Sequence, residues 1–141
     1  MEAYLMLCDA AEVMRDRAFV LGGGWVNRDA RMPGMAVVVL LDVPWDQANR
    51  KHEMQIALQD EDGNIIKAGD PPREVLMKGK FEVGRPAGHP AGMPLRFMQA
   101  INFHRLPLKP SQRYRWELKV DGETITWASF FTRPGKEQPT T

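Results

Sequence analysis

The side chains best suited to acid–base or metal chemistry are three histidines, which lie far apart in the sequence. His52, His89 and His104 form no H-x-H or H-E-x-x-H spacing, so a metal site would need ligands from distant segments. His52 lies in the charged run NRKHE and His104 ends a candidate strand, so we expect both at the surface. We therefore predict no metal site and no cofactor.

The other candidate motifs also lack a complete set of catalytic or binding residues. Cys8, the single cysteine, lies in the apolar run AYLMLCDA and is expected to be a small buried side chain. Neither of the two serines, Ser111 and Ser129, lies in a G-x-S-x-G motif. The run DEDGN lacks the frame of a calcium loop, and GGGW is not followed by the residues of a phosphate loop. The sequence therefore predicts a protein that is not an enzyme.

The composition is that of an ordinary globular domain. The chain has 141 residues, of which 43% are hydrophobic, and 19 basic against 18 acidic residues leave a net charge of +1. This balance gives no electrostatic footprint for nucleic acid. The start of the chain has no basic signal-peptide region, and the longest apolar run, MAVVVLLDV, is about half of a membrane span. We expect a soluble, cytoplasmic protein without membrane contacts.

The segment QRYRWELKVDGETITWASFF has the clearest strand pattern. Apolar residues at positions 114, 116, 118 and 120 alternate with charged residues, which predicts a strand with one apolar face. Asp121-Gly122 favours a two-residue hairpin turn. Folding the chain at this turn places Leu118 opposite Ile125 and Trp116 opposite Trp127, so the expected register buries both tryptophans on one face.

Charged residues occupy the other face of the predicted hairpin. Arg113, Arg115 and Lys119 share this face with Glu117, as expected for a solvated sheet surface. The functional alternative is a flat charged surface for a partner or for single-stranded nucleic acid, which would need exposed aromatic residues beside the charges. Because the expected register puts the aromatic residues on the opposite face, we predict no nucleic-acid binding.

A second hairpin is predicted at HEMQIALQDEDGNIIKAG. A three-residue loop at 61–63 places Leu58 opposite Ile66 and Ile56 opposite Ala68, so apolar residues face each other. Gly63 is then expected in the left-handed conformation of a bulge.

The remaining segments complete an all-β pattern. AYLMLCDAAEV, which is also compatible with a helix, and RAFVLGGGWVN form a predicted strand pair around Arg15-Asp16. Further strands are expected at MAVVVLLDVPW, EVLMKGKFEV and LRFMQAINFHRL, and only PWDQANRKH favours a turn or two of helix. We predict an all-β fold, an antiparallel β-sandwich of the immunoglobulin-like type with seven to nine strands. One domain would span 1–132, followed by a flexible tail at 133–141.

The stretch GRPAGHPAGMP, residues 84–94, contains a near-tandem Pro-Ala-Gly-x repeat. It is unsuited to link two domains, because the piece after it would hold only about three strands and could not bury its aromatic face alone. We predict an ordered, exposed loop inside one domain, stiffened by its prolines. Its first expected role is plain connection of two strands, and the alternative is contact with a partner. The candidate partner-binding residues are Arg85, Pro86, His89, Pro90 and Met93.

Three stretches, DVPWDQANRKH, GRPAGHPAGMP and LPLKPSQRYRWELKVDGE, resemble an uncharacterised family of small bacterial proteins, many of them actinobacterial. The resemblance runs from AYLMLCDAAEV to FFTRP and covers most of the chain. It implies a domain of unknown function with an immunoglobulin-like sandwich, and it implies no activity and no catalytic residue.

Two functions remain open from the sequence. The first is a non-catalytic domain for protein interaction or structural assembly, such as a homo-oligomer joined at an exposed sheet edge or a component of a phage or phage-like particle. Its partner would be another protein or a second copy of the chain. The alternative is a sandwich that binds a small ligand or a carbohydrate, with Trp25 or Trp45 exposed on a concave face.

Overall fold

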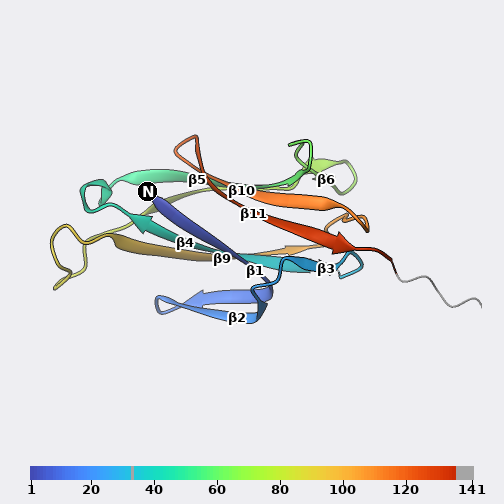
Figure 1. Cartoon of the computed structure of the whole chain (residues 1–141). Helices are drawn as coiled ribbons and strands as arrows, with labels where there is room; N and C mark the ends of the chain where they lie inside the picture. The colour runs from blue at the N-terminus through green and yellow to red at the C-terminus, as the bar shows by residue number, and fades with distance from the viewer. Residues whose placement is uncertain (33, 136–141) are drawn as a thin grey trace, which may run out of the picture.

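The computed structural model describes residues 1–32 and 34–135 and has two β-sheets packed face to face (Figure 1). The predicted all-β antiparallel sandwich is confirmed, with eleven strands in the described residues instead of seven to nine. Three of them, β3, β6 and β7, have only two or three residues. The strands are β1 (Glu2–Met14), β2 (Arg17–Gly23), β3 (Asn27–Asp29), β4 (Gly34–Val43), β5 (Lys51–Asp60), β6 (Lys67–Ala68), β7 (Arg73–Glu74), β8 (Leu76–Glu82), β9 (Leu95–His104), β10 (Arg113–Val120) and β11 (Glu123–Arg133).

The strand order resembles that of immunoglobulin-like sandwiches. One sheet has the order β2-β1-β4-β9 and the other has the order β3-β11-β10-β5-β8, while β6 and β7 pair only with each other. Without β2 and β3, these orders match the A-B-E and G-F-C-C′ strands of that fold. Tyr114, near the start of β10, accepts a hydrogen bond at its hydroxyl from the Lys109 backbone N–H at 2.9 Å. Such a tyrosine corner is typical of these sandwiches.

The core lies between the two sheets and contains the predicted apolar face of β10. Tyr114, Trp116, Leu118 and Val120 are all buried, as expected from their alternation. The ring of Trp116 packs on Phe103 of β9, with 4.4 Å between the ring centroids, and so joins the two sheets.

The β10–β11 hairpin has the predicted Asp121-Gly122 turn but not the predicted register. The pairing shifts at a bulge directly after Leu118, so Trp116 lies opposite Ala128 and not opposite Trp127. Leu118 likewise lies opposite Thr126, where we expected Ile125. Because one extra residue moves the following side chains to the other face of a strand, Trp127 lies on the outer face and is 50% exposed.

For the second predicted hairpin, at residues 52–69, the structure confirms the turn at 61–63 but not the strand pairing beyond it. Gly63 has a φ of 84°, and the Ile66 N–H donates to the Leu58 carbonyl at 2.9 Å, as the three-residue loop requires. The predicted pair of Ile56 with Ala68 is wrong, because Ile56 pairs with Met77 of β8. The chain leaves the sheet after the turn, and Ala68 pairs with Arg73 in the small β6–β7 hairpin.

Residues 9–23 form an arm, a hairpin that folds over the outer surface of its own sheet. The turn at Arg15-Asp16 has φ values of 51° and 59°, and β1 is a strand rather than the alternative helix. The Asn102 side chain of β9 exchanges two hydrogen bonds with the Ala11 backbone, at 2.9 and 3.3 Å. Figure 1 shows β2 as a separate layer beneath β9. A small second core of Cys8, Ala36 and Val38 is buried under the arm.

Helical structure is confined to one 3-10 turn, Trp45–Gln47, in the part of the chain that the structure describes. In the same part, no helix has the length and apolarity needed to cross a bilayer. The single domain at 1–132 stays a prediction. Of the predicted tail, residues 136–141 lie outside the described residues.

Changing Tyr114 to Phe should lower the free energy of unfolding by about 1 kcal/mol, because the Lys109 N–H loses its acceptor while the ring stays packed. Urea unfolding should show a lower midpoint with an unchanged m-value. An unchanged midpoint would mean that the tyrosine corner does not stabilise this sandwich.

Candidate functional site

The Pro-Ala-Gly-x repeat forms two successive turns in the loop at 84–94, which connects β8 with β9. In each turn the fourth residue donates its N–H to the carbonyl of the first proline, at 3.1 Å for His89 and 3.2 Å for Met93. The third residues, Gly88 and Gly92, have φ values of 83° and 81°, which type II turns require. The predicted ordered loop without regular strand or helix is therefore confirmed.

Trp45 anchors this loop to the rest of the molecule. The Arg85 guanidinium lies 4.1 Å from the centroid of the Trp45 ring, and its Nη2 donates to the Trp45 carbonyl at 2.6 Å. The His89 ring stacks on the same tryptophan at 5.8 Å and an angle of 9°. Two residues predicted to bind a partner and one predicted to bind a ligand thus come together. The side chains of Arg85 and His89 cover the Trp45 ring, so the ring is not free to stack on a ligand.

The rest of the loop lies at the surface beside a shallow hollow. Pro86, Pro90 and Met93 are exposed, whereas the Nε2 of His89 lies 3.0 Å from the Met93 carbonyl. The hollow has a volume of about 480 Å³ and is lined by Trp45 and Pro94, with carboxylates at its rim. Those carboxylates belong to Glu2, Asp42 and Asp46.

Trp25 lies at the edge of the core, where it also lines a hollow of about 380 Å³ together with Tyr4 and Trp127. It is half-buried and meets Phe130 edge to face, with 5.8 Å between the centroids and an angle of 83°. The Arg28 guanidinium lies 5.2 Å from its ring. The buried Trp25 Nε1 has no hydrogen-bond partner among the described residues.

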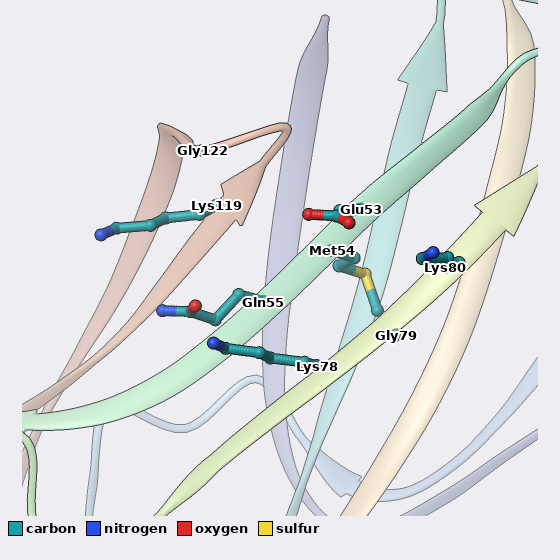
Figure 2. Close-up of a pocket in the computed structure, with 8 residues that line it drawn as sticks. All are labelled: Glu53, Met54, Gln55, Lys78, Gly79, Lys80, Lys119 and Gly122. Carbon is teal, nitrogen blue, oxygen red and sulfur yellow. The ribbon is translucent and has the colours of Figure 1, made fainter.

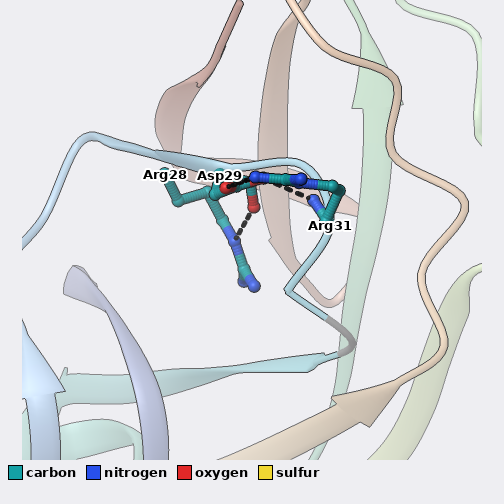
Figure 3. Close-up of polar contacts among 3 residues, drawn as sticks. All are labelled: Arg28, Asp29 and Arg31. Atoms are coloured by element: carbon teal, nitrogen blue, oxygen red, sulfur yellow. Dashed lines mark hydrogen bonds and ion pairs between the residues drawn. The ribbon is translucent and has the colours of Figure 1, made fainter. Parts of the chain in front are cut away.

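Arg28 is a buried cation that sequence patterns did not identify. It is 3% exposed, and both of its Nη atoms lack a hydrogen-bond partner within residues 1–32 and 34–135. Only its Nε donates, to the Asp29 carbonyl at 3.3 Å. Burial lowers its pKa. Figure 3 shows its guanidinium pointing away from the Asp29 carboxylate, which Arg31 binds at 3.0 Å and whose pKa is thereby lowered to about 2.

Replacing Arg28 with Met should leave the protein as stable or raise its free energy of unfolding by about 1–2 kcal/mol, because a poorly paired cation no longer needs to be desolvated. Thermal and urea unfolding measure the effect. Arg31→Met, on the exposed side of the same segment, serves as the control and should change stability little. A large loss in Arg28→Met alone would contradict the interpretation.

His52 is buried, so its predicted surface position is wrong. It is 5% exposed and stacks on Phe81 at 5.3 Å. Its Nδ1 lies 2.7 Å from the Asp121 carboxylate and its Nε2 lies 3.0 Å from the Gln47 carbonyl. Burial lowers the His52 pKa, but these two acceptors outweigh this effect and hold the pKa above the ordinary value of a histidine. The hydrogen bond from His52, together with one from the Glu53 N–H, lowers the pKa of Asp121.

This pair resembles a catalytic dyad but has the geometry of a structural clamp. Both ring nitrogens of His52 face an acceptor, so a proton shuttle would have to break one of these contacts. The clamp ties the 3-10 turn at Gln47 to the β10–β11 turn at Asp121. Cys8 is equally unsuited to attack, because burial raises the pKa of its thiol, and Asp9 raises it further.

The clamp predicts how stability depends on pH. Since the folded pKa of His52 is raised, its contribution is complete below pH 6.5 and is lost as pH rises through the folded pKa. His52→Gln should therefore cost about 1 kcal/mol below pH 6.5 and less above the folded pKa. Asp121→Asn keeps a residue that accepts positive φ and should flatten the profile in the same way. Parallel unfolding profiles for wild type and His52→Gln between mildly acidic and alkaline pH would refute the clamp.

The arm carries exposed apolar side chains that no sequence motif indicated. Met14, Phe19 and Leu21 point away from the sheet beneath and are 49%, 54% and 71% exposed. The strand β2 pairs only with β1, so its other edge is open. The run AFVL is apolar at every position, so alternation could not assign its faces. Its combination with GGG, next to a turn at Arg15-Asp16, was the available signal for an edge strand.

Within the described residues, no group of three His, Cys, Asp or Glu side chains is placed to hold a metal ion.

A comparison with known proteins identifies the family but no function. No curated protein and no solved structure matches the chain. The model of a family of unknown function, DUF6941, matches residues 3–131. The match includes both sheets and the loop on Trp45. The chain therefore belongs to the family of unknown function DUF6941.

Proposed function

We propose that this protein is a non-catalytic assembly domain that pairs with a second copy of itself through the open edge of β2. The observation that carries the proposal is the arm: an uncovered strand edge next to the exposed side chains of Met14, Phe19 and Leu21. Natural sheets protect such edges with charges, prolines or bulges. The edge strand has one charge, Arg17 at its start, and has no proline.

The sequence of β2 favours a second copy as the partner. An antiparallel pair centred on Phe19 places that residue beside its own counterpart, Ala18 opposite Val20 and Arg17 opposite Leu21. No like charges face each other, and the Arg17 stem can cover the Leu21 side chain. A two-fold axis at Phe19 thus makes the strand self-complementary. The net charge of +1 opposes association little.

The proposal is non-catalytic because two reactive side chains, those of His52 and Cys8, are engaged in structure. His52 is clamped between two acceptors, and Cys8 is buried with a raised pKa. The cytoplasm and a phage or phage-like particle are the settings we propose for such an assembly. We place the carbohydrate-binding alternative second. Arg85 and His89 cover Trp45, and Trp25 is half-buried against Phe130, although it lines a hollow with Tyr4 and Trp127.

Sedimentation velocity of the full chain over a concentration series tests self-association. Wild type should reach a dimer, and Phe19→Lys/Leu21→Lys should stay monomeric with unchanged circular dichroism, because exposed side chains change but the fold does not.

Met93→Lys, an equally exposed apolar residue on the 84–94 loop, is the matched control and should still dimerise. A monomeric wild type would overturn the proposal. A dimer that Met93→Lys disrupts and the arm variant preserves would move the interface to the loop.

A further inference from the structure

Positive charge is concentrated on the outer face of the five-stranded sheet, meaning the outward positions of β5, β8, β10 and β11. The basic residues there are Lys78, Lys80, Arg113, Arg115 and Lys119. The acidic residues are Glu117 and Glu53, and Glu53 lies opposite Lys80 across the strands. Lys51 and Glu82 form a second oppositely charged cross-strand pair at the end of the sheet. The face is therefore basic although the whole chain carries only +1.

Glu117 neutralises this face only in part, because its ion pair is with Lys119, while Lys78, Lys80, Arg113 and Arg115 form no ion pair within the described residues. It accepts hydrogen bonds from Gln59 Nε2 and Thr124 Oγ1, each at 3.0 Å, and Lys119 Nζ lies 3.9 Å away. The Arg115 Nε donates at 2.8 Å to the other end of the Gln59 amide. Arg115 thus has a neutral partner here and keeps its positive charge available.

A hollow of about 460 Å³ lies among the lysines of this face. Figure 2 shows Lys119, Gln55 and Lys78 extending to the same side from three neighbouring strands. Lys80 and Gly79 line the same hollow. The hollow combines three ammonium groups with the Gln55 amide and one carboxylate, that of Glu53. The ammonium groups outnumber the carboxylate, so the set still suits phosphate oxygens.

Exposed aromatic residues lie beside these charges. The bulge after Leu118 turns Trp127 to the outer face, where it is 50% exposed. The Arg115 guanidinium lies 5.3 Å from the centroid of its ring. Phe131 is also exposed and pairs with Arg113 across the strands. The reason for excluding nucleic acid, aromatic residues on the opposite face, therefore no longer holds.

Edge protection explains only part of this arrangement. Lysines on an outermost strand such as β8 discourage edge-to-edge pairing, which accounts for Lys78 and Lys80. It does not account for two arginines on β10, an internal strand, or for a half-exposed Trp127 beside them. Stacking platforms next to cations are what single-stranded nucleic acid requires. Duplex readout in the major groove uses a helix or a two-stranded ribbon, whereas this face is the broad surface of a sheet of five strands.

We infer that the outer face binds single-stranded nucleic acid, with Lys78, Lys80 and Lys119 on the phosphates and Trp127 stacked on a base. This site is on the opposite sheet from the arm and does not depend on self-association.

Fluorescence anisotropy of the full chain with labelled oligothymidine and oligouridine tests the inference. Binding should weaken with salt, with a slope of log K against log salt of about −2 for three phosphate contacts. Trp127→Ala should lower the affinity roughly 5- to 100-fold with the slope unchanged, because a stacking contact is lost. Lys78→Glu/Lys80→Glu should lower both affinity and slope.

Two matched variants control for general effects. Lys67→Glu/Lys109→Glu changes the net charge equally at exposed positions elsewhere, and Phe19→Ala removes an exposed aromatic from the arm. Both should bind like wild type. The inference is overturned by no binding at low salt, by an equal loss in Lys67→Glu/Lys109→Glu, by an unaffected Trp127→Ala, or by equally tight binding of duplex DNA or heparin.

Discussion

Burial of Trp116 between the sheets is the constraint on which the other features depend. Its contact with Phe103 joins β10 to β9, and the period of two along a strand then fixes every other side chain of β10. Tyr114 must point inward, where its hydroxyl reaches the Lys109 N–H. Arg113 and Arg115 must point outward. The internal strand β10 therefore contributes these two positive charges to the outer face of its sheet.

The bulge in the β10–β11 hairpin allows two residues of β11, Ile125 and Phe130, to pack into the same core. Ile125 packs against the core and Phe130 is buried on Tyr114 and Trp25, yet five positions separate these two residues. In an uninterrupted strand they would face opposite sides. One extra residue lets both point inward and turns Trp127 out to the solvent. Alternation and turn type predict a regular hairpin, so this placement required knowledge of the tertiary packing.

Local chemistry made some parts of the candidate sites predictable. Two Pro-Ala-Gly-x repeats determine two turns, because glycine permits a positive φ and proline fixes its own φ. The prediction of an ordered loop at 84–94 was therefore correct. Its anchor on Trp45 depends on residues about forty positions apart and has no local signal. The surface position predicted for His52 was wrong because it rested on the charged neighbours in NRKHE and not on the alternation of buried residues along β5. Counting back by twos from the buried Leu58 reaches His52 on the same face.

The arm and the basic outer face belong to different sheets, which allows them to act together. Figure 1 shows β2 and β5 in the outermost layers, with β4 and β9 between them. A second copy paired along β2 would therefore leave the outer face of each copy uncovered. Two equal single-strand sites on one dimer bind a long strand with a higher apparent affinity than either site, provided that the strand spans both. Dimerisation along β2 would then determine the apparent affinity of the protein for a long single strand.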